Sequence, residues 1–379
     1  MVFKAAGTGL LAAILFSCTG VSSSKKKIEQ ILQRYHWNGK FSGSALVGYR
    51  DTVVYEGAFG LADETWKITN TPATRFQIGS LTKQFTAALI LELAQQGRLN
   101  LDATLSVYLP DYRRDVADAV TIRQLLGHSA GVPDLVHRSD IMQIVKEPAT
   151  PQEVLSKYCS NALEFTPGTQ FKYSNCGYLI LGGLYQQVTG ETYADGLRRL
   201  TTRAGLTDTD ISGPRAIVPR LATAYVLENG QQIKAPYIDW SVAFSSGAVY
   251  STVRDLWRWR GELVAGQVLG EKGKKEIFAL RPFGYSFGWH VGRTNQAQLR
   301  TFLASDFDAQ PAPDNAALLV ASHSGDLPGF HSCMTLFLDR TWTVILLDNH
   351  DSKSLPNLAA EIINALLTRT PEARSTSSP

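Results

Sequence analysis

Residues 76–85 read FQIGSLTKQF and place a serine and a lysine three positions apart. From Leu81 to Gln96 the apolar residues recur at helical spacing, which predicts a helix that begins at this serine. Residues i and i+3 share one helix face, so Ser80 and Lys83 are expected side by side. The first turn of a helix leaves backbone N–H groups that can stabilise a negative oxygen. A capping serine on a surface helix fits these letters too, but the stretch also indicates a nucleophile beside its own base.

The composition is that of an ordinary globular protein. The chain has 379 residues, of which 44% are hydrophobic and 19% charged, with a formal net charge of +3. This length permits one large domain or two to three closely packed subdomains. The charges are near balance and basic residues do not alternate with aromatic ones, so we expect no nucleic-acid partner. Zinc-type cysteine spacings and an HExxH motif are absent, so we expect no metal and no cofactor.

The first 18 residues have the pattern of a secretory signal peptide. One positive charge, Lys4, precedes a short apolar run that falls far below the roughly 20 residues of a membrane span. The tetrapeptide LFSC that ends at Cys18 is similar to a bacterial lipobox, in which the cysteine is acylated. The alternative is a general signal peptide with Cys18 incidental. We expect an exported protein of the cell envelope, held at a membrane by a lipid on Cys18, with residues 19–35 as a polar tether.

The cysteine count predicts no disulfide framework. The four cysteines are widely spaced, at Cys18, Cys159, Cys176 and Cys333. With Cys18 lipidated, three remain, which is an odd number in a chain of this size.

The order of the predicted elements indicates an α+β fold. Two β-rich runs predict a hairpin over residues 41–60, and residues from about 100 to 240 are mainly helical patterns. Beyond residue 243 come a helix, four strand-like runs and a last helix. We therefore predict an antiparallel sheet flanked by helices with a helical insertion lobe, and a site in the cleft between them. The domain is expected over residues 36–368, with a disordered tail over 369–379.

A second candidate nucleophile lies in residues 127–131, GHSAG, which match the G-x-S-x-G elbow of α/β-hydrolases. That motif requires a strand before the serine and a helix after it. Here residues 121–126 fit a helix better than a buried strand, and Pro133 follows where the helix of an elbow should run. An α/β-hydrolase esterase with Ser129 as its nucleophile remains the alternative enzyme.

Two further motifs follow Ser80 and Lys83 in the chain, namely Tyr173-Ser174-Asn175 and His323-Ser324-Gly325. With them the chain resembles the superfamily of serine β-lactamases and D-Ala-D-Ala carboxypeptidases. It is most similar to the branch of class C β-lactamases, R-type DD-carboxypeptidases and related esterases. That branch carries S-x-x-K, Y-x-N and K/H-[TS]-G in the same order. LLGHSAGVPDL (125–135) and SSGAVYSTVRDLWRW (245–259) also resemble family stretches, and the likeness spans roughly residues 40–365.

The resemblance implies a role for each motif residue. Ser80 attacks the substrate carbonyl to form an acyl-enzyme, and Lys83 and Tyr173 exchange its proton. The oxyanion hole consists of the backbone N–H groups of Ser80 and Asp326. The residues that the resemblance assigns to substrate binding are Asn175, His323, Ser324 and Gly325.

One departure bears on the substrate. His323 stands where β-lactamases of this branch carry lysine, so its attraction for a substrate carboxylate is expected to be weak and pH-dependent. The resemblance leaves D-Ala peptides, β-lactams and small esters or amides as substrates. A catalytically inactive scaffold with a penicillin-binding fold is the non-enzyme alternative, although the chain keeps all four of Ser80, Lys83, Tyr173 and Asn175. The sequence does not determine the oligomeric state.

Overall fold

A computed structural model of the protein describes residues 8–211, 213, 216–304, 318–339 and 342–367. For residues 8–21 it describes the helix path alone. The predicted tail over 369–379 and the first seven residues of the predicted signal peptide lie outside the described residues. None of the described helices is long and apolar enough to cross a membrane.

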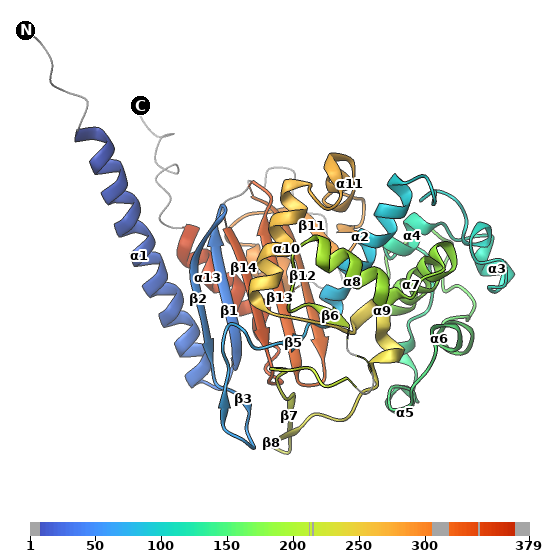
Figure 1. Ribbon diagram of the computed structural model, residues 1–379, viewed down its shortest axis with the longest axis horizontal. Helices are drawn as coiled ribbons and strands as arrows, with labels where there is room; N and C mark the ends of the chain where they lie inside the picture. Colours follow the sequence, from blue (N-terminus) through green and yellow to red (C-terminus); the bar gives the residue numbers. More distant parts are fainter. Residues whose placement is uncertain (1–7, 212, 214–215, 305–317, 340–341, 368–379) are drawn as a thin grey trace, which may run out of the picture.

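The centre of the molecule is a seven-stranded antiparallel sheet (Figure 1). Its order is β10-β11-β12-β13-β14-β1-β2, so strands from both ends of the sequence lie side by side. The predicted hairpin is confirmed as β1 and β2, and the four strand-like runs after residue 243 are confirmed as β11 to β14, while the short β10 was not predicted. The strands are β1 (Gly43–Tyr49), β2 (Thr52–Phe59), β10 (Tyr285–Ser286), β11 (Trp289–Thr294), β12 (Leu318–Leu327), β13 (Phe330–Phe337) and β14 (Trp342–Asp348).

Helices cover both faces of this sheet, which is why its central strands read as continuous apolar runs. Along β14, Ile345 and Leu347 belong to the core that includes α2 (Thr82–Gln95) and α10 (Val253–Ala265). The alternate residues Val344 and Leu346 belong to a second core, beneath α13 (Leu355–Leu367) and α1 (Thr8–Trp37). The predicted α+β class is confirmed.

The prediction of a tether over residues 19–35 is wrong for its second half. Helix α1 runs through this segment, and Ile28, Ile31 and Leu32 are buried in the core beneath α13. Three apolar residues at i, i+3 and i+4 form one apolar helix face. This face packs on the domain although the residues before it are small and polar. The packed domain therefore begins at about residue 28, earlier than the predicted residue 36.

The helical lobe stands beside the sheet, and Figure 1 shows it as the right half of the molecule. Helix α2 joins the two halves, and its residues from Thr82 to Leu93 are buried, as its apolar faces predict. The other helices are α3 (Arg114–Ala117), α4 (Ile122–Leu126), α5 (Ile141–Ile144), α6 (Pro151–Tyr158), α7 (Asn175–Thr189), α8 (Tyr193–Arg203), α9 (Phe244–Gly247), α11 (Gly270–Ile277) and α12 (Leu299–Ala304).

Short elements complete the fold. The single-turn 3₁₀ helices are η1 (Gly79–Leu81), η2 (Leu105–Val107), η3 (Leu135–His137) and η4 (Trp240–Ala243). The minor sheets pair β3 (Leu61–Asp63) with β4 (Ile68–Thr69), β9 (Val249–Ser251) with β5 (Phe76–Gln77) and β6 (Asp210–Ile211), and β7 (Tyr225–Glu228) with β8 (Gln231–Lys234).

One disulfide corrects the expectation drawn from the cysteine count. Cys159, just after α6, is bonded to Cys176 in the first turn of α7, and their Cα atoms are 5.3 Å apart. The packing of α6 against α7 brings the two cysteines together across 17 residues, which their spacing alone does not reveal. Cys333 is buried in β13 and takes no part in this disulfide.

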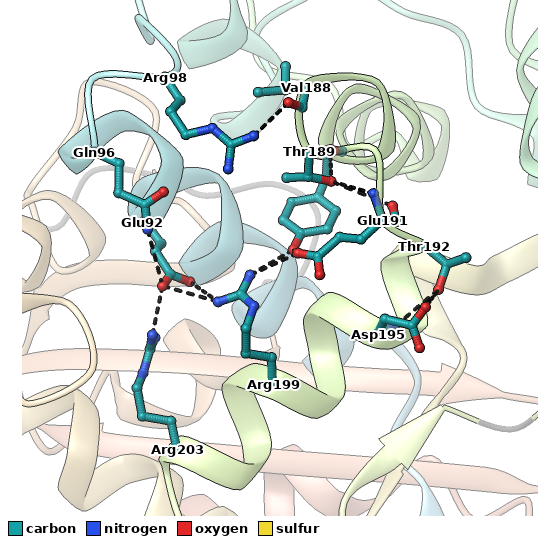
Figure 2. A network of polar contacts seen from close by, with 11 residues as sticks. Glu92, Gln96, Arg98, Val188, Thr189, Glu191, Thr192, Asp195, Arg199 and Arg203 are labelled. Atoms are coloured by element: carbon teal, nitrogen blue, oxygen red, sulfur yellow. Dashed lines mark hydrogen bonds and ion pairs between the residues drawn. The ribbon is translucent and has the colours of Figure 1, made fainter.

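A polar network fastens α2 to the outer helices of the lobe (Figure 2). Glu92 of α2 accepts hydrogen bonds from Arg199, at 3.2 Å, and from Arg203, at 2.6 Å. Arg199 also donates to Tyr185 of α7, at 2.8 Å, and to Glu191, at 3.0 Å. Burial alone would raise the pKa of Glu92, but the arginines lower it, so the carboxylate is charged at neutral pH.

If α1 belongs to the domain, Leu32→Ala should destabilise it. Leu32 is fully buried, so truncation leaves a cavity and should lower the free energy of unfolding by about 3 kcal/mol. Chemical denaturation of the variant and the parent measures this difference. Leu280 is 53% exposed, so Leu280→Ala is the control and should change stability by about 0.5 kcal/mol or less. An unchanged stability of Leu32→Ala would contradict the burial of α1 in the domain and favour the predicted tether.

Candidate active site

The serine of the first motif lies where the helical lobe meets the sheet. Ser80 is in η1, immediately before α2, and η1 contacts the end of β12. Two glycines make this approach possible. Gly79 has a φ of +51°, and a Cβ there would lie 3.2 Å from the Asp326 backbone nitrogen. A Cβ on Gly325 would collide with the carbonyl oxygen of Ile78.

The end of β12 is a strand edge beside this serine. Strand β11 pairs with β12 as far as Ser322, whereas β13 pairs with β12 through Leu327. Among the described strands, residues 323–327 therefore have a partner on one side alone. Such an edge can accept an extended substrate backbone as an added strand.

Lys83 is fully buried one turn after Ser80. Its Nζ lies 3.1 Å from Ser80 Oγ, 2.8 Å from Asn175 Oδ1 and 2.8 Å from the Ser246 carbonyl oxygen. Burial lowers the pKa of Lys83 to about 7, although the charge of Asp134 opposes this shift. A substantial fraction of the lysine is thus an uncharged amine near neutral pH.

The contacts of this amine decide which way its lone pair faces. An uncharged amine has two N–H donors and one lone pair. Asn175 Oδ1 and the Ser246 carbonyl oxygen are acceptors, and they occupy both donors. The lone pair then faces Ser80 Oγ, from which it can accept the hydroxyl proton.

The second motif approaches Lys83 from the start of α7. Ser174 caps this helix, and Asn175 Nδ2 donates to Asp134 Oδ2 at 2.9 Å. The Tyr173 ring lies 4.8 Å from Lys83 Nζ, measured to the ring centroid. The Cys159–Cys176 disulfide directly follows Asn175, so it anchors the segment that holds the lysine.

The GHSAG loop supports this segment instead of carrying a nucleophile. Helix α4 precedes it where an elbow needs a strand, and Ser129 is not among the described residues that line the cavity. His128 Nδ1 accepts a hydrogen bond from the Ser174 N–H at 3.1 Å, and the His128 ring lies 4.2 Å from the Tyr173 ring. The structure thus lacks the geometry that the Ser129 alternative requires.

His323 is buried, and both of its ring nitrogens are engaged. Nδ1 lies 2.6 Å from the Ser324 carbonyl oxygen and Nε2 lies 3.0 Å from Tyr285 Oη. A carbonyl can only accept, so Nδ1 carries the proton and Nε2 accepts from the tyrosine hydroxyl. Burial, with His290 and Lys83 nearby, lowers the pKa of His323 well below its usual range. Neither ring nitrogen of His323 is therefore free to bind a substrate carboxylate. The expected pH-dependent attraction for a carboxylate does not follow from this arrangement.

A cavity of about 540 Å³ collects most of the predicted site. The predicted residues that line it are Ser80, Tyr173, Asn175, His323, Ser324 and Asp326. Sequence reasoning missed Asp134, Ser246 and Tyr285. Asp134 and Ser246 had a signal, because they lie in the family-like stretches LLGHSAGVPDL and SSGAVYSTVRDLWRW, whereas Tyr285 lies in neither. Cys18 lies within α1, far from Ser80 along the chain. Its lipidation stays a prediction. The described residues include no cluster of three side chains able to hold a metal.

Comparisons with known proteins agree with this arrangement. The family described as Beta-lactamase matches residues 28–367. Penicillin-binding protein 4* of Bacillus subtilis is 24% identical over 350 residues, covering 87% of this chain and 72% of the relative. D-amino acid amidase from Ochrobactrum anthropi superposes with a TM-score of 0.73 at 23% identity, covering 94% of this chain and 99% of that one. EstCE1, a hydrolase with promiscuous acyltransferase activity, gives 0.76 at 20% identity, with 92% and 99% covered.

The pKa of Lys83 predicts the pH dependence of catalysis. Only the uncharged amine accepts a proton, so kcat/KM should rise with pH, reach half its maximum near pH 7 and then level off. Lys83→Arg should abolish activity, because a guanidinium stays charged. Initial rates on a chromogenic ester between pH 5 and pH 10 provide the test. A profile that is flat down to pH 5 would contradict the role of Lys83.

Asp134→Asn should move this profile. The substitution keeps an oxygen that can accept from Asn175 Nδ2, but it removes the charge that raises the pKa of Lys83. The acid limb should therefore shift to lower pH, by roughly one unit. Asp134→Ala, which also removes the hydrogen bond, should lower the maximal rate as well. A limb that stays in place in Asp134→Asn would show that this charge does not reach Lys83.

Proposed function

The chain belongs to the beta-lactamase family, and we propose that it is a serine hydrolase that forms an acyl-enzyme on Ser80. The observation that carries the proposal is the contact of Ser80 Oγ with a fully buried lysine amine whose two donors are already used. This contact supports a nucleophile whose proton has a defined acceptor. It argues against an inactive scaffold, which has no need to hold a buried lysine in this way.

Each site residue has a proposed role in acyl transfer. Ser80 Oγ attacks the substrate carbonyl while Lys83 accepts its proton. The backbone N–H groups of Ser80 and Asp326 hold the oxyanion at the junction of η1 and β12. Tyr173, beside Lys83, passes the proton to the leaving group. Water then attacks the acyl-enzyme, with the same pair as its base.

The substrates that we propose are esters or amides. The relatives point to this range, since their names include a penicillin-binding protein, a D-amino acid amidase and a hydrolase with acyltransferase activity. We also propose that the protein is exported and anchored by a lipid on Cys18. The Cys159–Cys176 disulfide supports export, because such bonds persist in oxidising compartments.

Ser80→Ala should abolish the hydrolysis of p-nitrophenyl butyrate. We expect a loss of about 10³-fold or more in kcat, because the nucleophile is removed. Ser129→Ala is the matched control and should keep the activity of the parent. Intact-mass spectrometry after rapid acid quenching should show an acyl adduct on the parent and none on Ser80→Ala. Activity that survives in Ser80→Ala and disappears in Ser129→Ala would overturn the assignment.

A further inference from the structure

Building on the proposed function, we propose that Ser80 acts on uncharged esters or amides with an apolar acyl group, and that the site rejects acyl groups that carry a carboxylate. Three observations carry this inference: the one lysine among the described lining residues is paired with a glutamate, the cavity contains two carboxylates, and one of its walls is mainly apolar.

The basic residues around the cavity have partners within the protein. Lys172 is the only lysine or arginine among the described residues that line it, and its exposed Nζ lies 2.6 Å from Glu164 Oε1. Lys83 lies behind Ser80 with its donors used by Asn175 and Ser246. His323 donates to one acceptor and accepts from Tyr285. The one cation that a substrate carboxylate would meet here is Lys172, for which it would compete with Glu164.

Two carboxylates face the same space. Asp134 is 8% exposed, and Asp326 follows the strand edge beside Ser80 with its side chain 57% exposed. Asp326 Oδ1 lies 2.9 Å from His331 Nδ1, and although burial acts to raise the pKa of Asp326, this hydrogen bond lowers it. Although burial acts to lower the pKa of His331, Asp326 raises it, so His331 and Lys353 offset part of the Asp326 charge. Asp134 adds a second carboxylate that opposes an anionic substrate.

One wall of the cavity is mainly apolar. It consists of η3, α5 and η4, and hydrogen bonds hold its parts together: the Asp239 N–H donates to the Val145 carbonyl at 2.7 Å. Val136 is 46% exposed and Met142 is 40% exposed, although both are apolar. An acyl chain would cover this surface and remove it from water. The apolar residues of this wall that line the cavity include Leu135, Val136, Ile141, Met142, Trp240 and Val242, and His137 lines it as well.

A matched pair of esters tests the rejection of carboxylates. p-Nitrophenyl butyrate and mono-p-nitrophenyl succinate differ in a terminal methyl against a terminal carboxylate. The parent should prefer butyrate by roughly 100-fold in kcat/KM, since like charges oppose each other in the cavity. Assays at pH 6 and pH 8 show whether the preference holds on both sides of the Lys83 pKa. Equal or faster hydrolysis of the succinate at either pH would overturn the inference.

A chain-length series tests the apolar wall. From acetate to hexanoate, kcat/KM should rise about fourfold per methylene that the wall covers. Met142→Ser should lower the hexanoate-to-acetate ratio about fivefold, because it makes the wall polar. Leu280→Ser is the control, since Leu280 is exposed away from the lining residues, and it should keep the ratio of the parent. A ratio that is flat with chain length, or unchanged in Met142→Ser, would contradict the role of the wall.

The outcomes separate this inference from the proposed function. Hydrolysis that depends on Ser80 but prefers the succinate would support the proposed serine hydrolase and contradict the proposed substrate class. Ester hydrolysis that persists in Ser80→Ala would contradict both the proposed function and the proposed substrate class. The absence of both hydrolysis and an acyl adduct in the parent would do the same.

Discussion

The burial of one lysine amine is the constraint on which the rest of the site depends. Removing a charged ammonium from water is costly, so Lys83 meets that cost by losing its proton near neutral pH. The amine still needs partners for its two N–H groups, and these come from α7 and α9, far away in the sequence. The sheet, α2 and the helical lobe must therefore all be in place before Ser80 has a base. The contacts of Lys83 thus depend on the complete fold, and the proposed chemistry depends on those contacts.

The segment that carries Tyr173 and Asn175 is held on several sides. Asp134 fixes the amide of Asn175, the imidazole of His128 accepts from the backbone of Ser174, and the disulfide ties the next residue to α6. Each contact restricts the rotation of a group that must meet Lys83 within hydrogen-bonding distance. The GHSAG loop thus supports the segment that holds Tyr173 and Asn175, and its position beside the site follows from this contact.

The sequence predicts the fold class and the main site residues because the three motifs and the strand runs are local patterns. It does not predict contacts between distant segments. Cys159 and Cys176 meet only because α6 packs on α7, and Tyr285 reaches His323 only through the pairing of β10, β11 and β12. One local signal was overlooked: Asn229-Gly230 is a typical two-residue hairpin turn, and it joins β7 to β8.

The exchange of lysine for His323 changes more than one charge. A lysine at this position would need acceptors or a substrate anion to remain charged in a buried site, whereas a neutral imidazole can be satisfied by Tyr285 and a backbone carbonyl. Once satisfied in this way, the imidazole contributes no attraction for an anion, and Asp134 and Asp326 add carboxylates to the same cavity. For the substrate class that we propose, binding energy comes from the apolar wall, which acts on the acyl group and does not depend on salt. The same substitution thus links the internal hydrogen bonds of the site to the kind of substrate that it can hold.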